Sequence, residues 1–259
     1  MERRFRNLAA LACSAMTIGV GALSAQKPKS PKEIQAIQAV QAAQTPDDRV
    51  KAIENVLTNF ADTEFKIILL QMALQSEQQK GDYAQTVFYA QRLLDADPKS
   101  AVALVTLAGE TARHTREFDL DKDEKLAKVD KWAKDGVEAA KTMPKPRPDF
   151  PDDQMELMRK DTQSQGYEAL GMGASLRKKY DDAVADFKQA ISVSATPDPA
   201  TYVRLGQAYE DAGKLDDASE AFDKALNAPN VLPQVKTIAQ TKKQEVAKRK
   251  AGGAPTPQP

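Results

Sequence analysis

From Pro31 onward, apolar residues recur along the chain at the three- and four-residue spacing of a helix face. The clearest early stripe consists of Val50, Ile53, Val56, Leu57 and Phe60. No segment shows the alternation of apolar and polar residues between turn signals that a strand requires. Glycine and proline residues separate the helical stretches. The pattern therefore predicts an all-α chain.

Two segments in the second half of the sequence repeat each other at an offset of 35 residues. Tyr167, Leu170, Gly171, Ala183, Phe187 and Ala190 return as Tyr202, Leu205, Gly206, Ala218, Phe222 and Ala225, and the second copy adds Tyr209. Each copy reads as two helices. The missing side chain at each glycine allows its helix to approach its partner closely, and each phenylalanine fills the remaining space. Because one pair cannot bury its apolar faces alone, the pairs are expected to stack.

This pattern resembles the tetratricopeptide repeat, which has an aromatic, Leu-Gly and an aromatic on its first helix and Ala, an aromatic and Ala on its second. The first copy departs from it at Ala174, where a second aromatic is usual, and its closing proline comes late, at Pro197. The resemblance implies a right-handed α-solenoid of stacked antiparallel helix pairs. It also implies a concave groove that grips an extended peptide or a helix.

The repeat register places eight residues in this groove. They are Val105, Glu168, Met172, Ser175, Val203, Arg204, Gln207 and Glu210. A variant of the family that clamps a terminal carboxylate needs Lys, Asn and Arg at set groove positions. Glu168 and Met172 occupy two of these positions and only Arg204 fits, so a carboxylate clamp is disfavoured. The groove is expected to suit a ligand of mixed apolar and polar character.

The remaining sequence suggests how the array is organised, with five helix pairs in total. We expect divergent helix pairs over 32–143, a proline-rich elbow at 144–151, the two clear repeats over 152–230, a capping helix at 231–250 and a disordered tail at 251–259. An insertion around 115–122 separates the helices of the third pair. The elbow is interpreted as a rigid spacer between two sub-solenoids, with a proline-motif ligand as the alternative.

The first 25 residues have the character of an export signal. Arg3, Arg4 and Arg6 precede an uncharged run that ends in small residues at Ala25, as in a secretory signal peptide. Cleavage there predicts an exported protein, periplasmic or secreted, with no integral membrane span. Two alternatives are an uncleaved segment that tethers the chain to the membrane and lipidation at Cys13.

Composition narrows the possible functions. Among 259 residues, 37 Lys and Arg balance 37 Asp and Glu, which argues against a nucleic-acid partner. One cysteine and one histidine exclude a disulfide scaffold and multi-thiolate or multi-histidine metal sites. His114 lies between Arg113 and Arg116 and is interpreted as a solvated helix-end residue. The acidic run at 119–124 lacks the glycine and distal glutamate of a calcium loop. No catalytic residue, metal or cofactor is therefore predicted.

The leading hypothesis is a non-catalytic protein-interaction scaffold or adapter of the cell envelope, with a protein or peptide partner. The alternative is a carboxylate-rich metal-dependent or enzymatic protein with its site at the elbow. A structural oligomer joined through the basic capping helix is a third possibility. The basic residues of that helix, Lys236, Lys242, Lys243, Lys248, Arg249 and Lys250, are interpreted as a solvated outer face, with an anionic lipid or an acidic partner as the alternative.

Overall fold

The computed structural model describes residues 27–229 and 231–252, and within these ranges the only regular elements are helices. They are α1 (Pro31–Ala42), α2 (Pro46–Asn59), α3 (Lys66–Lys80), α4 (Tyr83–Ala96), α5 (Ala101–His114), α6 (Lys122–Lys141), α7 (Asp152–Leu176), α8 (Tyr180–Val193), α9 (Pro199–Asp211), α10 (Leu215–Asn227) and α11 (Pro233–Gly252). The expected export signal and residues 253–259 of the expected tail lie outside the described residues. Ala251 and Gly252, which were assigned to the tail, complete α11.

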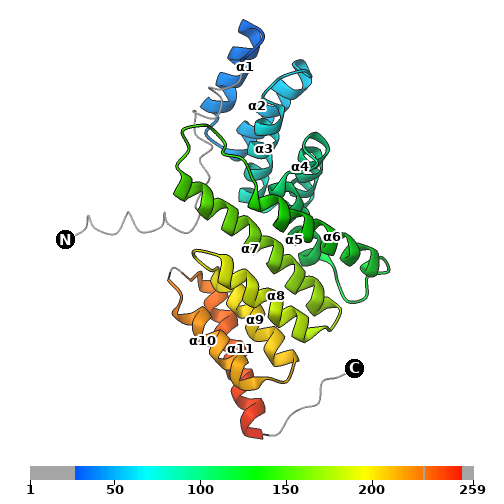
Figure 1. Ribbon diagram of the computed structural model, residues 1–259, viewed down its shortest axis with the longest axis vertical. Helices are drawn as coiled ribbons and strands as arrows, with labels where there is room; N and C mark the ends of the chain where they lie inside the picture. Colours follow the sequence, from blue (N-terminus) through cyan, green and yellow to red (C-terminus); the bar gives the residue numbers. More distant parts are fainter. Residues whose placement is uncertain (1–26, 230, 253–259) are drawn as a thin grey trace, which may run out of the picture.

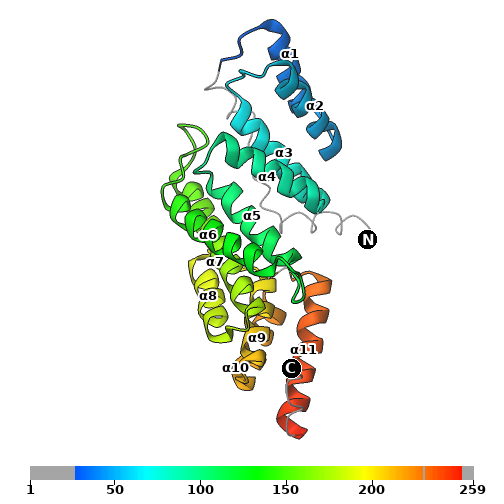
Figure 2. The ribbon, with the colours of Figure 1, turned by 90° about the vertical axis from the view of Figure 1, so that its right-hand side faces the viewer.

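Helices α1 to α10 form five antiparallel pairs that follow one another along the long axis of the molecule (Figures 1 and 2). Each helix packs against the next in sequence, and α5 and α7 also pack together, as do α9 and α11. The last helix covers the end of the stack formed by α9 and α10. This arrangement confirms the all-α solenoid of stacked pairs.

Local sequence explains where several helices begin and end. The side chains of Ser30, Thr45, Asp82 and Ser100 each accept a hydrogen bond from a backbone N–H in the first turn of the helix that follows. Gly81 ends α3 in the left-handed conformation, with φ 71°, which glycine adopts without a steric penalty.

The two clear repeats share one packing contact. A Cβ placed on Gly171 would lie 2.7 Å from the Phe187 ring, and one placed on Gly206 would lie 2.5 Å from the Phe222 ring. Both rings are almost fully buried. The predicted close approach of helices at these glycines is therefore present in both pairs, with a phenylalanine ring lying on the bare backbone.

The proline-rich segment after α6 connects two helices that pack directly against each other. One apolar cluster contains Ala108 from α5, Ala133 from α6 and Ala169 from α7, so the core continues past this connection. Arg159 of α7 donates hydrogen bonds to the Met143 carbonyl oxygen at 2.7 and 3.1 Å, which fastens the segment to the stack. The segment forms a loop on the left-hand side of Figure 1 and does not separate two stacks.

Candidate functional site

Six of the eight predicted groove residues lie on α7 and α9, the first helices of the two clear repeats, and remain partly exposed. We call them the α7–α9 strip: Glu168, Met172, Ser175, Val203, Arg204 and Gln207. The two helices contact each other, so the strip crosses from one repeat to the next.

An ion pair between Glu168 and Arg204 lies within the strip and joins its two helices. The same Glu168 carboxylate accepts a hydrogen bond from the Thr201 hydroxyl at 3.2 Å. The Glu168 side chain is 15% exposed and that of Arg204 is 31% exposed, so both charges are partly shielded from water. The two charges compensate each other, which leaves this part of the strip close to neutral.

The other strip residues supply mixed chemistry. Met172 packs against two apolar clusters, and Val203 packs against the cluster that contains Phe222. Gln207 donates a hydrogen bond from Nε2 to the Asp211 carboxylate at 3.0 Å. Ser175 and Gln207 add polar side chains to the strip. A ligand on the strip would therefore find both apolar contact and hydrogen-bonding groups.

The structure corrects the prediction for Val105, which is only 2% exposed. Its Cγ1 lies 2.7 Å from where a Cβ on Gly136 would be and 3.4 Å from where a Cβ on Gly166 would be. The glycines of α6 and α7 thus let two backbones close over this side chain. Val105 belongs to the core and cannot line an accessible groove.

Glu210 is the second correction, since it is 6% exposed and lies beneath the capping helix. Its carboxylate pairs with Arg249 of α11 at 2.9 Å, and Lys242 lies 3.8 Å away. Lys243 and Lys250 of α11 pair with Asp223 and Asp216 of α10. Four of the basic residues predicted to form a solvated outer face therefore lie against the last pair, although the Lys250–Asp216 pair is itself exposed.

His114 lies at the end of α5, as predicted, and is exposed. Its ring stacks on Tyr83 with centroids 3.6 Å apart, and Nδ1 lies 3.0 Å from the Glu110 carbonyl oxygen. Within residues 27–229 and 231–252, no group of three or more His, Cys, Asp or Glu side chains has the arrangement to hold a metal ion. None of the helices in these ranges is long and apolar enough to cross a membrane.

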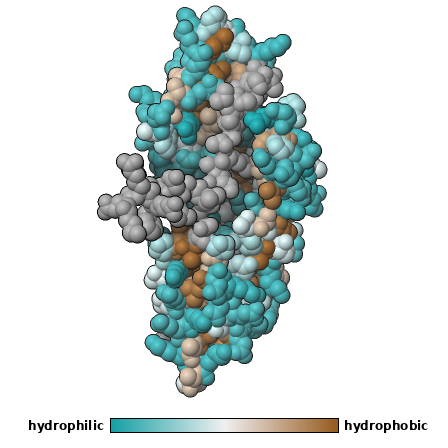
Figure 3. All heavy atoms as spheres, turned by 90° about the vertical axis from the view of Figure 1, so that its left-hand side faces the viewer, coloured by the Kyte–Doolittle hydropathy of each residue, from teal (hydrophilic) through white to brown (hydrophobic). Residues whose placement is uncertain are grey.

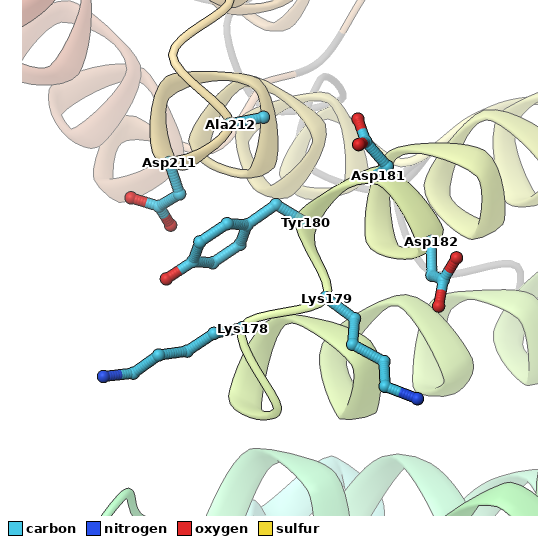
Figure 4. Close-up of a pocket in the computed structure, with 7 residues that line it drawn as sticks. All are labelled: Lys178, Lys179, Tyr180, Asp181, Asp182, Asp211 and Ala212. Atoms are coloured by element: carbon cyan, nitrogen blue, oxygen red, sulfur yellow. The ribbon is translucent and has the colours of Figure 1, made fainter.

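Two shallow polar clefts were not anticipated from the sequence. The first has a volume of about 410 Å³ and lies between the α7–α8 and α9–α10 turns. Figure 4 shows that Lys178, Tyr180 and Asp211 extend to one side of it, whereas Lys179 and Asp182 extend to the other. The sequence signal for this cleft is the recurrence of Lys-x-Asp-Asp at both turns, at 179–182 and 214–217.

The second cleft, of about 360 Å³, lies between α6 and α8. Arg177 forms a two-pronged ion pair with Asp130 across it, at 3.1 and 3.0 Å. Partial burial raises the pKa of Asp186 to about 6, with a further contribution from the charges of Asp182 and Asp130. The lining of the first cleft has two lysines and three aspartates, whereas that of the second has three basic and three acidic side chains. On the face shown in Figure 3, hydrophobic residues form separate small patches among hydrophilic ones.

Comparison with known proteins identifies a matching repeat family and solved structures of similar fold. The family model of the tetratricopeptide repeat matches residues 175–240. A MamA protein of known structure is similar with a TM-score of 0.52 and 16% identity, covering 87% of this chain and 98% of that one. A thermophilic TPR protein from Thermus thermophilus gives 0.51 and 16%, covering 81% and 95%.

PilW, described as a widely conserved type IV pilus biogenesis factor, gives a TM-score of 0.51 at 15% identity, covering 85% of this chain and 91% of that one. No curated protein sequence matches the chain. At such identities the similarity concerns the fold. The resemblance to tetratricopeptide repeats is confirmed, and the chain folds as a solenoid of that type.

Proposed function

We propose that this chain is a non-catalytic protein-interaction scaffold of the cell envelope that binds a peptide or a helix along the α7–α9 strip. Solenoids of this fold generally serve as scaffolds for protein interactions and offer extended surfaces for that purpose. The observation that carries the proposal is the strip itself, in which partly exposed side chains on consecutive first helices continue from one repeat to the next.

The chemistry of the strip favours a nearly neutral ligand with apolar and polar side chains. Met172 and Val203 offer apolar surface, and Ser175 and Gln207 can donate and accept hydrogen bonds. Because Glu168 and Arg204 already neutralise each other, the strip has no uncompensated positive charge for a terminal carboxylate. An amphipathic helix or an extended segment satisfies these conditions.

The envelope location rests on the export signal expected in residues 1–25, and export to the periplasm or secretion is part of the proposal. The metal-dependent or enzymatic alternative placed its site at the proline-rich segment. There Lys145 pairs with Asp152 and Arg147 with Asp149. Each pair joins one carboxylate of this segment to a basic neighbour, and no observation at this segment favours the alternative.

Two substitutions in the strip test the proposal. A partner is first isolated with the wild-type protein from an envelope fraction, and its affinity is then measured with purified components. Gln207→Trp places bulk on the strip at a partly exposed position, and Met172→Glu places a charge there. Lys188→Trp, on the exposed face of α8, is the matched control.

We expect at least a tenfold loss of affinity for both strip variants and none for the control. Circular dichroism checks that each variant is folded, which matters most for Met172 because it packs against core residues. If the partner binds Gln207→Trp as tightly as wild type, the strip is not the binding site.

A further inference from the structure

The capping helix α11 carries one short sequence pattern twice, seven residues apart. An apolar residue is followed three and four positions later by two basic residues, first as Ala239, Lys242 and Lys243 and then as Val246, Arg249 and Lys250. A spacing of seven residues places the two copies on the same face of a helix. The helix therefore presents a row of apolar side chains bordered by cations.

The surface that α11 contacts has complementary charges at the same spacing. It comprises three acidic side chains and one aromatic ring, and we call it the α11 seat: Glu210, Asp216, Phe222 and Asp223. Asp216 and Asp223 are also seven residues apart, on α10. Lys243 pairs with Asp223. Lys250 pairs with Asp216, so the second basic residue of each copy of the pattern meets its own aspartate.

The first basic residue of each copy is directed to Glu210 of α9 instead. Arg249 pairs with the Glu210 carboxylate at 2.9 Å, and the Lys242 ammonium lies 3.8 Å from Oε2. Val246 is fully buried in the same apolar cluster as the Phe222 ring. An apolar and basic helix face thus lies on an apolar and acidic surface, as a helical ligand lies in its groove.

Glu210 stands at a groove position of its repeat, where capping alone does not require a charge. The repeat offset of 35 residues relates it to Ser175, which is partly exposed in the α7–α9 strip. A terminal cap needs an apolar contact and a polar outer face. A carboxylate at position 210 adds a desolvation cost when α11 covers it. Its presence favours a surface that recognises charge over one that is only closed off.

The contact between α11 and its seat is small. Of the twenty residues of α11, all of which the structure describes, only Ala239 and Val246 are buried. The two ion pairs with the α10 aspartates are partly or largely exposed, and such pairs contribute little to stability. Oε2 of Glu210 and Nε of Arg249 are buried without a hydrogen-bond partner among the described residues. We expect a helix attached in this way to detach locally at a lower free-energy cost than unfolding of the stack.

We propose that the α11 seat is a binding site for a basic helix of a partner protein, and that α11 occupies the seat as an internal ligand until such a helix displaces it. The recognised helix carries the α11 pattern, in which an apolar residue precedes two basic residues and the pattern recurs after seven positions. Opposite charges on the helix and the seat accelerate their association. The seat adjoins the α7–α9 strip, because Val203 packs against the cluster that contains Val246, but the proposal does not depend on ligand binding by the strip.

A synthetic peptide of residues 231–252 probes the seat in the full-length protein. The receptor is Arg249→Ala, in which α11 is attached more weakly and the seat is unchanged. One altered peptide carries Lys242→Glu and Arg249→Glu. The control peptide carries Thr241→Glu, Gln244→Glu and Lys248→Glu, which change the net charge equally at exposed positions away from the seat. Binding is measured by NMR titration with labelled receptor.

We expect the unaltered peptide to bind Arg249→Ala at least about fivefold more tightly than the wild-type protein, in which the intact α11 competes. The Lys242→Glu/Arg249→Glu peptide should lose at least about tenfold in affinity, and the control peptide less than about twofold. Adding Glu210→Gln to the receptor should also weaken binding at least about fivefold. Glu220→Gln, at an exposed pair on α10, is the matched control and should not.

Hydrogen exchange of the wild-type protein gives an independent check, because α11 should exchange by local opening, at least about tenfold faster than α9 and α10. Unchanged exchange in α9 and α10 confirms that the receptor is folded, and Lys242→Ala serves as a second receptor. The proposal is overturned if α11 opens only together with α9 and α10, if the peptide binds neither receptor, or if the two altered peptides bind equally. A wild-type dimer that dissociates when the peptide is added would also overturn it, since a second copy of the chain would then occupy the seat.

Discussion

The Phe222 ring of α10 lies directly on the backbone of Gly206 in α9, so that a Cβ at position 206 would be 2.5 Å from ring atom Cε1. The same relationship holds between Gly171 and Phe187 one repeat earlier, at 2.7 Å. Real Cβ atoms do not approach other atoms so closely. The spacing within both pairs is therefore set by a ring resting on a residue without a side chain.

We predict that Gly206→Leu destabilises the protein more than Tyr209→Leu. A leucine at 206 must push α9 and α10 apart, at a typical overpacking cost of roughly 1–3 kcal/mol. Tyr209→Leu keeps most of the apolar volume and should cost about 1 kcal/mol or less. Hydrogen exchange should show fraying of α9–α11 before α1–α6 respond, because coupling in a solenoid is between neighbours. Unchanged protection over 200–226 in Gly206→Leu would contradict the packing described above.

A pair of alanine substitutions on one helix isolates the role of the ring contact. Gly171→Ala should destabilise the protein, by roughly 1 kcal/mol or more, because its Cβ collides with Phe187. At Gly173 the nearest atoms to a Cβ are side-chain atoms at 3.4 and 3.5 Å, so Gly173→Ala should be neutral or should stabilise by up to about 1 kcal/mol. Urea unfolding of the two variants gives the comparison. If both substitutions change the free energy of unfolding equally, contact with the Phe187 ring does not determine the cost of a side chain at position 171.

Most of the fold could be predicted because each helix carries its own signals. Apolar spacing, helix caps and breakers placed the helix pairs to within a few residues, and the repeat offset located Gly171 and Gly206. The end of α7 is the exception, because neither glycine nor proline directly follows Leu176 in the sequence. The chain leaves the helix after Leu176 because Lys178 takes the left-handed conformation needed for a tight turn.

The site was harder to predict because burial depends on neighbours in space. The register of α5 alone places Val105 in a groove, but Gly136 and Gly166 on two other helices allow it to be covered. Glu210 likewise appears accessible until α11 folds over it. Phe118, in the connection between α5 and α6, is exposed, which could not be read from its own neighbourhood, since aromatic residues in helical sequences normally enter a core.

The ion pair beneath the capping helix leads to a prediction for α11. Oε2 of Glu210 is buried without a hydrogen-bond partner among the described residues, so its charge relies on Arg249 and Lys242. Arg249→Ala should cost about 1–3 kcal/mol, and Glu210→Gln less, because arginine left alone can turn to solvent. Lys250→Ala, at an exposed pair, is the control and should change little. Hydrogen exchange in α11 is the measurement, and equal protection in Arg249→Ala and Lys250→Ala would rule out the role assigned to Glu210.

Asp186 predicts a dependence of stability on pH. Its pKa is raised to about 6 in the folded protein, whereas an unfolded aspartate titrates near about pH 4. Between these values the native state binds more protons, so stability falls as pH rises through this window and stays lower above it. Asp186→Asn should remove this slope and add about 1 kcal/mol at pH 7, allowing for solvent screening of a partly exposed group.

Thermal unfolding at pH 4 and pH 7 measures the effect of Asp186→Asn. Little difference between the variant and wild type is expected at pH 4, and a higher melting temperature is expected for the variant at pH 7. Asp182→Asn, which removes only a neighbouring charge, should give a smaller gain. A variant that is no more stable than wild type at pH 7 would show that burial does not penalise this carboxylate.

The continuous core across the proline-rich connection means that covalent continuity at that point is not what joins the two parts of the molecule. A single cut within 144–148 would leave α6 and α7 packed through Ala133 and Ala169. Two separately synthesised fragments divided there should therefore assemble into one particle when mixed, as the halves of a split protein do. The same loop should also tolerate the new termini of a circularly permuted chain or an inserted domain. The segment that first suggested a boundary between two sub-solenoids is thus a site where the chain can be divided or extended without separating the core.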